Sequence, residues 1–198
     1  MANTNAPFGA RPYKGFGAGA NWEIQKIKSG IDDANTTKIY KGDLVKKLNT
    51  GYLAQWTATT AVSQLAGIFW GCQYLSTALG RRVYSPYWPG ADTAVDADIF
   101  LIPATGAAPL QIIMQCDSTG VALADRGMNF DITVGTGSTT TSLSGSYVDV
   151  STIATTATLP LRLINLWSDI AVGPGTQAGA YNWGVFQLNT SGAGATGI

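Results

Sequence analysis

The chain has 198 residues and a mass of 20.7 kDa, enough for one full-sized domain with its own core, so its size does not force it to rely on a metal or a disulfide. Only 12% of its residues are charged, against about 25% in ordinary domains, and the net charge is zero. There is no histidine and a single glutamate, which excludes the usual Ser-His-Asp and Cys-His nucleophiles and the commonest zinc ligand.

The charges and cysteines limit the partners that we expect. All seven lysines lie between Lys14 and Lys47, which we interpret as a guard on edge strands, with an acidic protein surface or nucleic acid as the alternative targets. No uncharged apolar stretch approaches the ~18 residues of a membrane span, and the first residues lack a hydrophobic signal core. Cys72 and Cys116 are expected to be reduced and buried, with a 72–116 disulfide as the alternative.

Residues 1–21 predict an extended N-terminal arm. Pro7 and Pro12 remove backbone donors, residues 15–20 are nearly all glycine and alanine, and no hydrophobic period is present. Aromatic side chains are spaced along this thread, so we expect it to become ordered on a neighbouring subunit; a disordered leader is the alternative. The expected contact residues of the arm are Pro7, Phe8, Arg11, Pro12, Tyr13 and Phe16.

Residues 22–190 predict an all-β body, either a β-sandwich or a small β-barrel, with little helix. Short runs rich in β-formers follow one another at 21–28, 36–48, 51–58 and 65–75, separated by turn residues. Asn49-Thr50-Gly51 favours a hairpin turn, Gly42-Asp43 a turn, and Gly67 a bulge. The low Glu and high Thr content also favours sheet over helix.

Residues 84–92 (YSPYWPGAD) contain two prolines and three aromatics, and this pattern predicts a rigid surface loop. Aromatic and arginine side chains carry much of the binding energy of protein interfaces, so we expect protein contact here and do not expect nucleic-acid binding. A sugar-stacking platform on Tyr84, Tyr87 and Trp88 is an alternative. The residues of this candidate interface loop are Arg81, Arg82, Tyr84, Tyr87 and Trp88.

The second half of the chain continues as strands. Residues 96–104 and 110–117 are nearly continuous apolar runs typical of strands covered on both faces, and one helical turn is expected before Gly127. We interpret residues 135–158 as strand and loop, and 159–167 and 181–189 as closing strands. Residues 191–198 predict a flexible tail. Two subdomains, 22–90 and 91–190, are an alternative to one continuous body.

No pattern in the sequence predicts catalysis, a metal or a cofactor. The candidate acids, Asp32-Asp33, Asp92, Asp96 and Asp98, lie in turn-like contexts where aspartate caps backbone donors. Asp96 and Asp98 lack the glycine and terminal glutamate of a calcium-binding loop. The glycines of residues 15–19 precede the first strand and have no accompanying lysine-serine pair, so they do not predict a phosphate-binding loop.

Residues 5–12 (NAPFGARP) resemble the start of small structural proteins of tailed phages that accompany the capsid proteins. The runs GDLV (42–45), GIFWG (67–71), YWPG (87–90) and the stretch 139–151 follow in the order found in such head proteins, so the resemblance spans roughly residues 5–155. The family it indicates is that of head decoration, or cement, proteins.

This resemblance implies a non-enzymatic virion protein, made in the bacterial cytoplasm, that binds the outer capsid surface and bridges neighbouring major capsid subunits. It also implies a homo-oligomer, with a trimer as first choice and a dimer as second. The alternatives are a tail or receptor-binding component and a carbohydrate-binding β-module.

Overall fold

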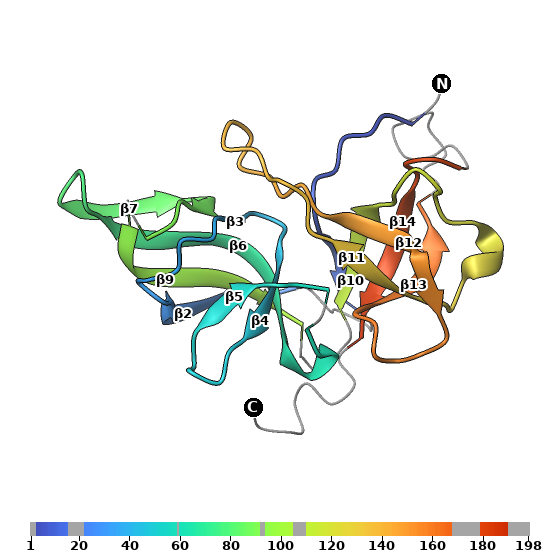
Figure 1. Ribbon diagram of the computed structural model, residues 1–198, viewed down its shortest axis with the longest axis horizontal. Coiled ribbons are helices and arrows are strands. Elements are labelled where there is room, and N and C mark those ends of the chain that lie inside the picture. Colours follow the sequence, from blue (N-terminus) through green and yellow to red (C-terminus); the bar gives the residue numbers. More distant parts are fainter. Residues whose placement is uncertain are drawn as a thin grey trace.

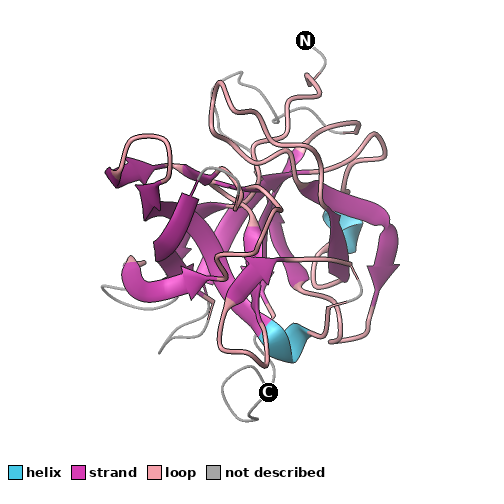
Figure 2. Ribbon diagram, turned by 60° about the vertical axis from the view of Figure 1, so that its left-hand side comes forward, coloured by secondary structure: helices cyan, strands magenta, loops and turns pink. Residues whose placement is uncertain are grey.

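The computed structural model describes residues 3–15, 22–58, 60–91, 94–104, 110–167 and 179–189. The predicted all-β class is confirmed, since nearly all regular structure is antiparallel strand (Figure 2). Within these ranges the helical segments are two short 3₁₀ turns, η1 (Val62–Gln64) and η2 (Leu123–Asp125). The second of these confirms the helical turn expected before Gly127.

One sheet occupies the left of Figure 1 and is built mostly from the first half of the chain. Its strand order is β2-β9-β6-β4-β5, and β7 pairs with the far part of β6. The bounds are β2 (Gln25–Ile31), β4 (Leu44–Lys47), β5 (Leu53–Gln55), β6 (Leu65–Ser76), β7 (Arg81–Ser85) and β9 (Ala94–Pro103).

The turns predicted in this sheet are present. The β4–β5 hairpin turns at Gly51, which adopts φ +91° and donates its N–H to Leu48 O. The β4–β6 register shifts beside Gly67, so the predicted bulge is also confirmed. A small two-stranded sheet, β3 (Ile39–Tyr40) with β8 (Tyr87–Trp88), is packed against β6.

The second sheet lies at the right of Figure 1 and curls into a small barrel. Its order is β1-β10-β14-β13-β11-β12, and a parallel bridge from Cys116 to Val148 brings β12 back to the end of β10. We call it the barrel sheet. Its strands are β1 (Arg11–Gly15), β10 (Leu110–Gln115), β11 (Asn129–Thr133), β12 (Tyr147–Ala154), β13 (Leu161–Leu166) and β14 (Trp183–Leu188).

The hydrophobic core forms two clusters. The larger fills the barrel and includes Leu44 and Ile68 of the first sheet and Trp56, which directly follows β5, so the two sheets share it. The smaller lies on the opposite face of the first sheet, beneath β3 and β8. Cys116 belongs to the larger cluster and Cys72 to the smaller; both are buried free thiols, which confirms the expected state and excludes the alternative disulfide.

The described part of the N-terminal segment lies along the body of its own chain. Strand β1 pairs antiparallel with β10, and Phe8 and Ala10 are buried. The Gln115 side chain accepts the N–H of Ala6 at 3.0 Å and donates to Thr4 O at 2.7 Å. Proline fits here because β1 is an edge strand. Phe16 and the predicted tail, 191–198, lie outside the described residues.

Four segments that lie far apart in the sequence meet at one junction beside β1: residues 8–10, 41–43, 69 and 142–144. The loop between β11 and β12 crosses toward the first sheet (Figure 1), where Ser144 donates its N–H to Lys41 O. Gly42 accepts from Ala10 N at 2.8 Å and donates to Phe69 O at 2.9 Å. The backbones approach so closely that a Cβ on Gly9 would lie 2.5 Å from Ser144 Cβ.

A buried carboxylate fixes this junction. Asp43 Oδ1 accepts from Ser144 Oγ at 2.5 Å and Ser146 Oγ at 3.1 Å, while Oδ2 accepts from Tyr40 N at 2.8 Å and Gln55 Nε2 at 2.9 Å. Burial nevertheless raises the pKa of Asp43 above its usual value, because desolvation outweighs these hydrogen bonds. Asp43 therefore ties the first sheet to the barrel sheet.

Candidate functional site: a cation–aromatic groove beside strand β1

A groove of about 340 Å³ opens beside the N-terminal segment. We call it the cation–aromatic groove. Five separate parts of the chain form its walls. They are residues 8–12 at the start of β1, Trp22 before β2, the β3–β4 turn, strand β6 and the β11–β12 loop. The lining residues are Phe8, Ala10, Arg11, Pro12, Trp22, Lys41, Gly42, Trp70 and Leu143.

Two cations lie over aromatic rings in this groove. Arg11 Cζ is 4.1 Å from the centroid of the Phe8 ring, and Lys41 Nζ is 3.9 Å from that of Trp70. Both distances are within the range of cation–π attraction. Trp22, 37% exposed, lies 5.5 Å from Trp70 between ring centroids and extends the aromatic surface.

A second hollow of about 580 Å³ adjoins the groove and shares Phe8, Arg11 and Leu143 with it. The Phe8 ring stands edge-on to Trp183 there, with centroids 4.8 Å apart. No carboxylate lines either hollow among the described residues. The combined surface is therefore aromatic and positively charged.

The structure brings four of the six arm residues predicted from sequence to this surface, with one change of role, whereas Tyr13 lines neither hollow. Pro7, Arg11 and Pro12 line one or both hollows, whereas Phe8 is only 5% exposed and serves as the ring beneath Arg11. Tyr13 is 42% exposed and packs edge-on against Trp167 at 5.3 Å. The segment thus presents its cation and prolines while Phe8 anchors it.

The candidate interface loop is divided by the fold. Arg81, Arg82 and Tyr84 are exposed on β7, with Tyr84 61% exposed. The expectation of a surface position is wrong for Trp88, which is 0% exposed and donates its Nε1–H to Asn35 O at 3.0 Å. Tyr87 is stacked on Tyr40 at 5.6 Å, so the three aromatics do not form one sugar-stacking platform.

Asp96 and Asp98 take part in ion pairs. Lys26 Nζ is 2.8 Å from Asp98 Oδ2, and Arg82 contacts both Asp96 and Asp98. The hydrogen bond from Lys26 is the main reason that the pKa of Asp98 is held below its usual value. We call Lys26, Arg82, Asp96 and Asp98 the ion-pair cluster, and their charges are mutually neutralised.

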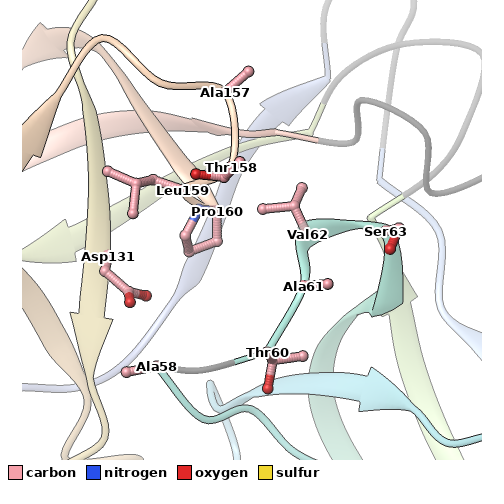
Figure 3. A pocket seen from close by; sticks show the side chains of 10 residues that line it. All are labelled: Ala58, Thr60, Ala61, Val62, Ser63, Asp131, Ala157, Thr158, Leu159 and Pro160. Atoms are coloured by element: carbon pink, nitrogen blue, oxygen red, sulfur yellow. The ribbon is translucent and has the colours of Figure 1, made fainter.

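A third hollow, of about 620 Å³, lies between residues 58 and 60–63 on one side and residues 157–160 on the other (Figure 3). Asp131, 7% exposed, borders it and accepts Ile132 N at 2.8 Å. Desolvation raises the pKa of Asp131, and the hydrogen bond from the Ile132 N–H partly opposes this rise. Asp131 is the one titratable side chain lining this hollow among the described residues, so the hollow contains no acid–base pair.

Across the described ranges, no group of three or more metal-binding side chains comes together. In the same ranges, no helix is both long enough and apolar enough to cross a membrane. The chemistry that the groove offers is recognition by aromatic faces and fixed positive charge.

Sequence reasoning identified the β1 side of the groove and missed the opposite wall. The residues of that wall lie far apart in the sequence, and the hydrogen bonds of the β3–β4 turn with β6 and with the β11–β12 loop bring three of them together: Lys41, Trp70 and Leu143. Trp22 joins them by packing on Trp70. The one local pattern that could have indicated this wall is Trp22, a tryptophan just before a strand that contains Lys26 and Lys28. Comparisons of the chain with protein-family models, with curated proteins and with solved structures found no match.

Proposed function

We propose that this chain is a non-enzymatic structural protein of a tailed-phage virion that binds the outer surface of the capsid and bridges neighbouring major capsid subunits. The observation that carries the proposal is the cation–aromatic groove beside β1. Aromatic and arginine side chains in a concave surface are what protein interfaces use for their strongest contacts.

The architecture supports this role. A cement protein must hold a fixed shape while it binds many equivalent sites, and the shared core and the Asp43 junction join the two sheets firmly. The resemblance of residues 5–12 and of the later runs to head decoration proteins supports the same role. We further propose that the protein forms a trimer, with a dimer as second choice, because accessory virion proteins sit on symmetry axes.

The test is binding of the purified protein to expanded, tailless empty heads of the phage that encodes it, followed by electron cryomicroscopy of the saturated particles. We expect stoichiometric density outside the shell, at positions that reveal the oligomer. Trp22→Ala should weaken binding at least tenfold, whereas Tyr84→Ala, an exposed aromatic outside the groove, should leave it unchanged.

Absence of density on heads would contradict the proposal. Binding to purified tails under the same conditions would indicate the tail or receptor-binding alternative. The structure gives less support to a carbohydrate-binding role than the sequence pattern does, because Trp88 is buried in the core and cannot stack on a sugar.

A further inference from the structure

The two cations of the groove lie over aromatic rings, and among the described residues no ion pair joins either of them to a carboxylate. Lys26 and Arg82 pair with carboxylates, Lys46 donates to Thr57 and Thr60, and Arg126 donates to Asn165. For Arg11 and Lys41, the contacts within the described residues are the aromatic rings beneath them.

Cations held in this way keep their hydrogen-bond donors available. A ring attracts the positive charge through its face and accepts no strong hydrogen bond, so the donors of Arg11 and Lys41 remain free to meet an anion. Asp43, two residues from Lys41 in the sequence, is fully engaged by four donors of the junction. The groove is thus positively charged, and its complement is not supplied by the described residues.

We infer that the cation–aromatic groove binds an acidic segment of a protein partner, in which an aspartate or glutamate carboxylate lies next to an apolar side chain. The carboxylate meets Arg11 and Lys41 in charge-assisted hydrogen bonds, and the apolar side chain packs on Trp22 and Trp70. This inference rests on the proposed function, since it states the chemistry that the capsid surface would present.

A protein carboxylate fits the groove better than a nucleic-acid phosphate. Nucleic-acid surfaces follow a string of phosphates with a stripe of basic side chains, whereas this groove has two cations set among apolar residues in a chain of zero net charge. Two cations suit a single carboxylate, and the aromatic walls suit the side chain beside it.

The first test uses the isolated full-length protein and two dipeptide probes, N-acetyl-aspartyl-phenylalanine amide and its neutral isostere N-acetyl-asparaginyl-phenylalanine amide. Binding is followed by the indole N–H resonances of Trp22 and Trp70. We expect a dissociation constant on the order of 1 mM for the acidic probe, and binding about fivefold weaker for the neutral one. Added salt should reduce the difference in affinity between the two probes, because it screens the charges.

Charge removal supplies the matched variants. In the double variant Arg11→Gln with Lys41→Gln the two probes should bind equally, whereas Arg81→Gln, an exposed arginine outside the groove, should keep the fivefold preference. The double variant Arg11→Lys with Lys41→Arg, which keeps both charges, should retain most of the preference for the acidic probe. Equal binding of both probes to the wild type would overturn the inference, as would tighter binding of a single-stranded oligonucleotide that displaces the acidic probe.

A second test separates this inference from the proposed function. Carbodiimide treatment of protein-saturated heads joins an amine to an adjacent carboxylate as an amide with loss of water, so Lys41 should be cross-linked to an acidic residue of the capsid protein. If the protein binds heads but Lys41 forms no cross-link and the double Gln variant binds normally, the inference fails and the proposed function stands. If the protein does not bind heads but still prefers the acidic dipeptide, the proposed function fails and the acidic preference of the groove stands.

Discussion

Lys41 and Asp43 lie two residues apart, and the fold treats their charges in opposite ways. The Asp43 carboxylate points into the junction, where four donors of its own chain surround it. The Lys41 ammonium lies over Trp70 at the groove, with no carboxylate among the lining residues. A charged group whose hydrogen-bonding capacity is filled by its own chain is not available to a partner, whereas one left without a counter-charge is.

The largest expected effect comes from removing the internal charge. Asp43→Ala should lower the free energy of unfolding by about 3 to 4 kcal/mol, because buried donors of Tyr40, Gln55 and Ser144 lose their acceptor. Urea unfolding measures this loss, and Asp43→Asn, which keeps one acceptor oxygen, should lose less. A loss below about 1 kcal/mol would show that the junction does not depend on this carboxylate.

The pH dependence of the same site has a defined sign. Desolvation raises the folded-state pKa of Asp43 above the unfolded value, so its contribution to stability is complete below about pH 4 and decreases as pH rises through the folded pKa. The stability difference between wild type and Asp43→Asn should therefore decrease with rising pH in this window. An increase would mean that the hydrogen bonds outweigh desolvation.

Gly9→Ala should cost roughly 2 to 3 kcal/mol. Gly9 has φ +72°, and a Cβ there would lie 2.5 Å from Ser144 Cβ and 2.6 Å from Gly42 O, so the substitution combines backbone strain with a clash at the junction. Gly51→Ala is the matched control, since φ is +91° but nothing lies within 4 Å; it should cost about 1 kcal/mol. Equal losses in thermal unfolding would argue against close packing at Gly9.

The ion-pair cluster should contribute less than the junction. Lys26→Gln is expected to reduce stability by about 0.5 to 1 kcal/mol, because the Lys26 side chain is 45% exposed and solvent screens its pair with Asp98. The pKa of Asp98 is lowered, so its contribution is present above about pH 4 and lost as pH falls through the folded pKa. Unfolding at low and high salt checks this, and a salt-independent loss would exclude an electrostatic origin.

The smallest effect on stability is expected at the groove. Lys41→Gln removes one partly exposed cation–π contact and should cost about 0.5 kcal/mol. Its effect on head binding should nevertheless exceed that of Lys26→Gln, which is more disruptive to the fold. The opposite ranking in a sedimentation assay would remove the distinction between internally satisfied and available charge.

Local patterns predicted much of this fold and little of its long-range pairing. The strand runs, the Gly51 turn, the Gly67 bulge and the turn before Gly127 depend on nearby residues, and these expectations were confirmed. The burial of Phe8 depends on β1 pairing with β10, about 100 residues away, and no local signal encodes that pairing. The prolines and glycines of residues 1–21 therefore predicted an extended arm, with no sign of the pairing with β10.

The absence of a local signal for long-range pairing also explains why the burial of Trp88 and one wall of the groove were not predicted. The prolines around Trp88 indicated a surface loop, and they do interrupt the sheet, but β8 pairs with β3 over an apolar face that needs a cover. Arg11 and Pro12 were predicted as contact residues from their segment alone, and the structure places both in the lining of the groove. Lys41 and Trp70 come together through the hydrogen bonds of Gly42 and Asp43 with Phe69, a long-range pairing that no local pattern encodes.

The placement of one free thiol in each core cluster has a consequence for how the body opens. Burial raises the pKa of Cys72 to about 12 and raises that of Cys116 as well, so neither thiol is reactive at neutral pH while its cluster stays closed. The rate at which each cysteine is alkylated in the native state therefore reports transient opening of its own cluster. Equal rates would show that the two sheets unfold as one cooperative unit, and unequal rates would identify which half loosens first.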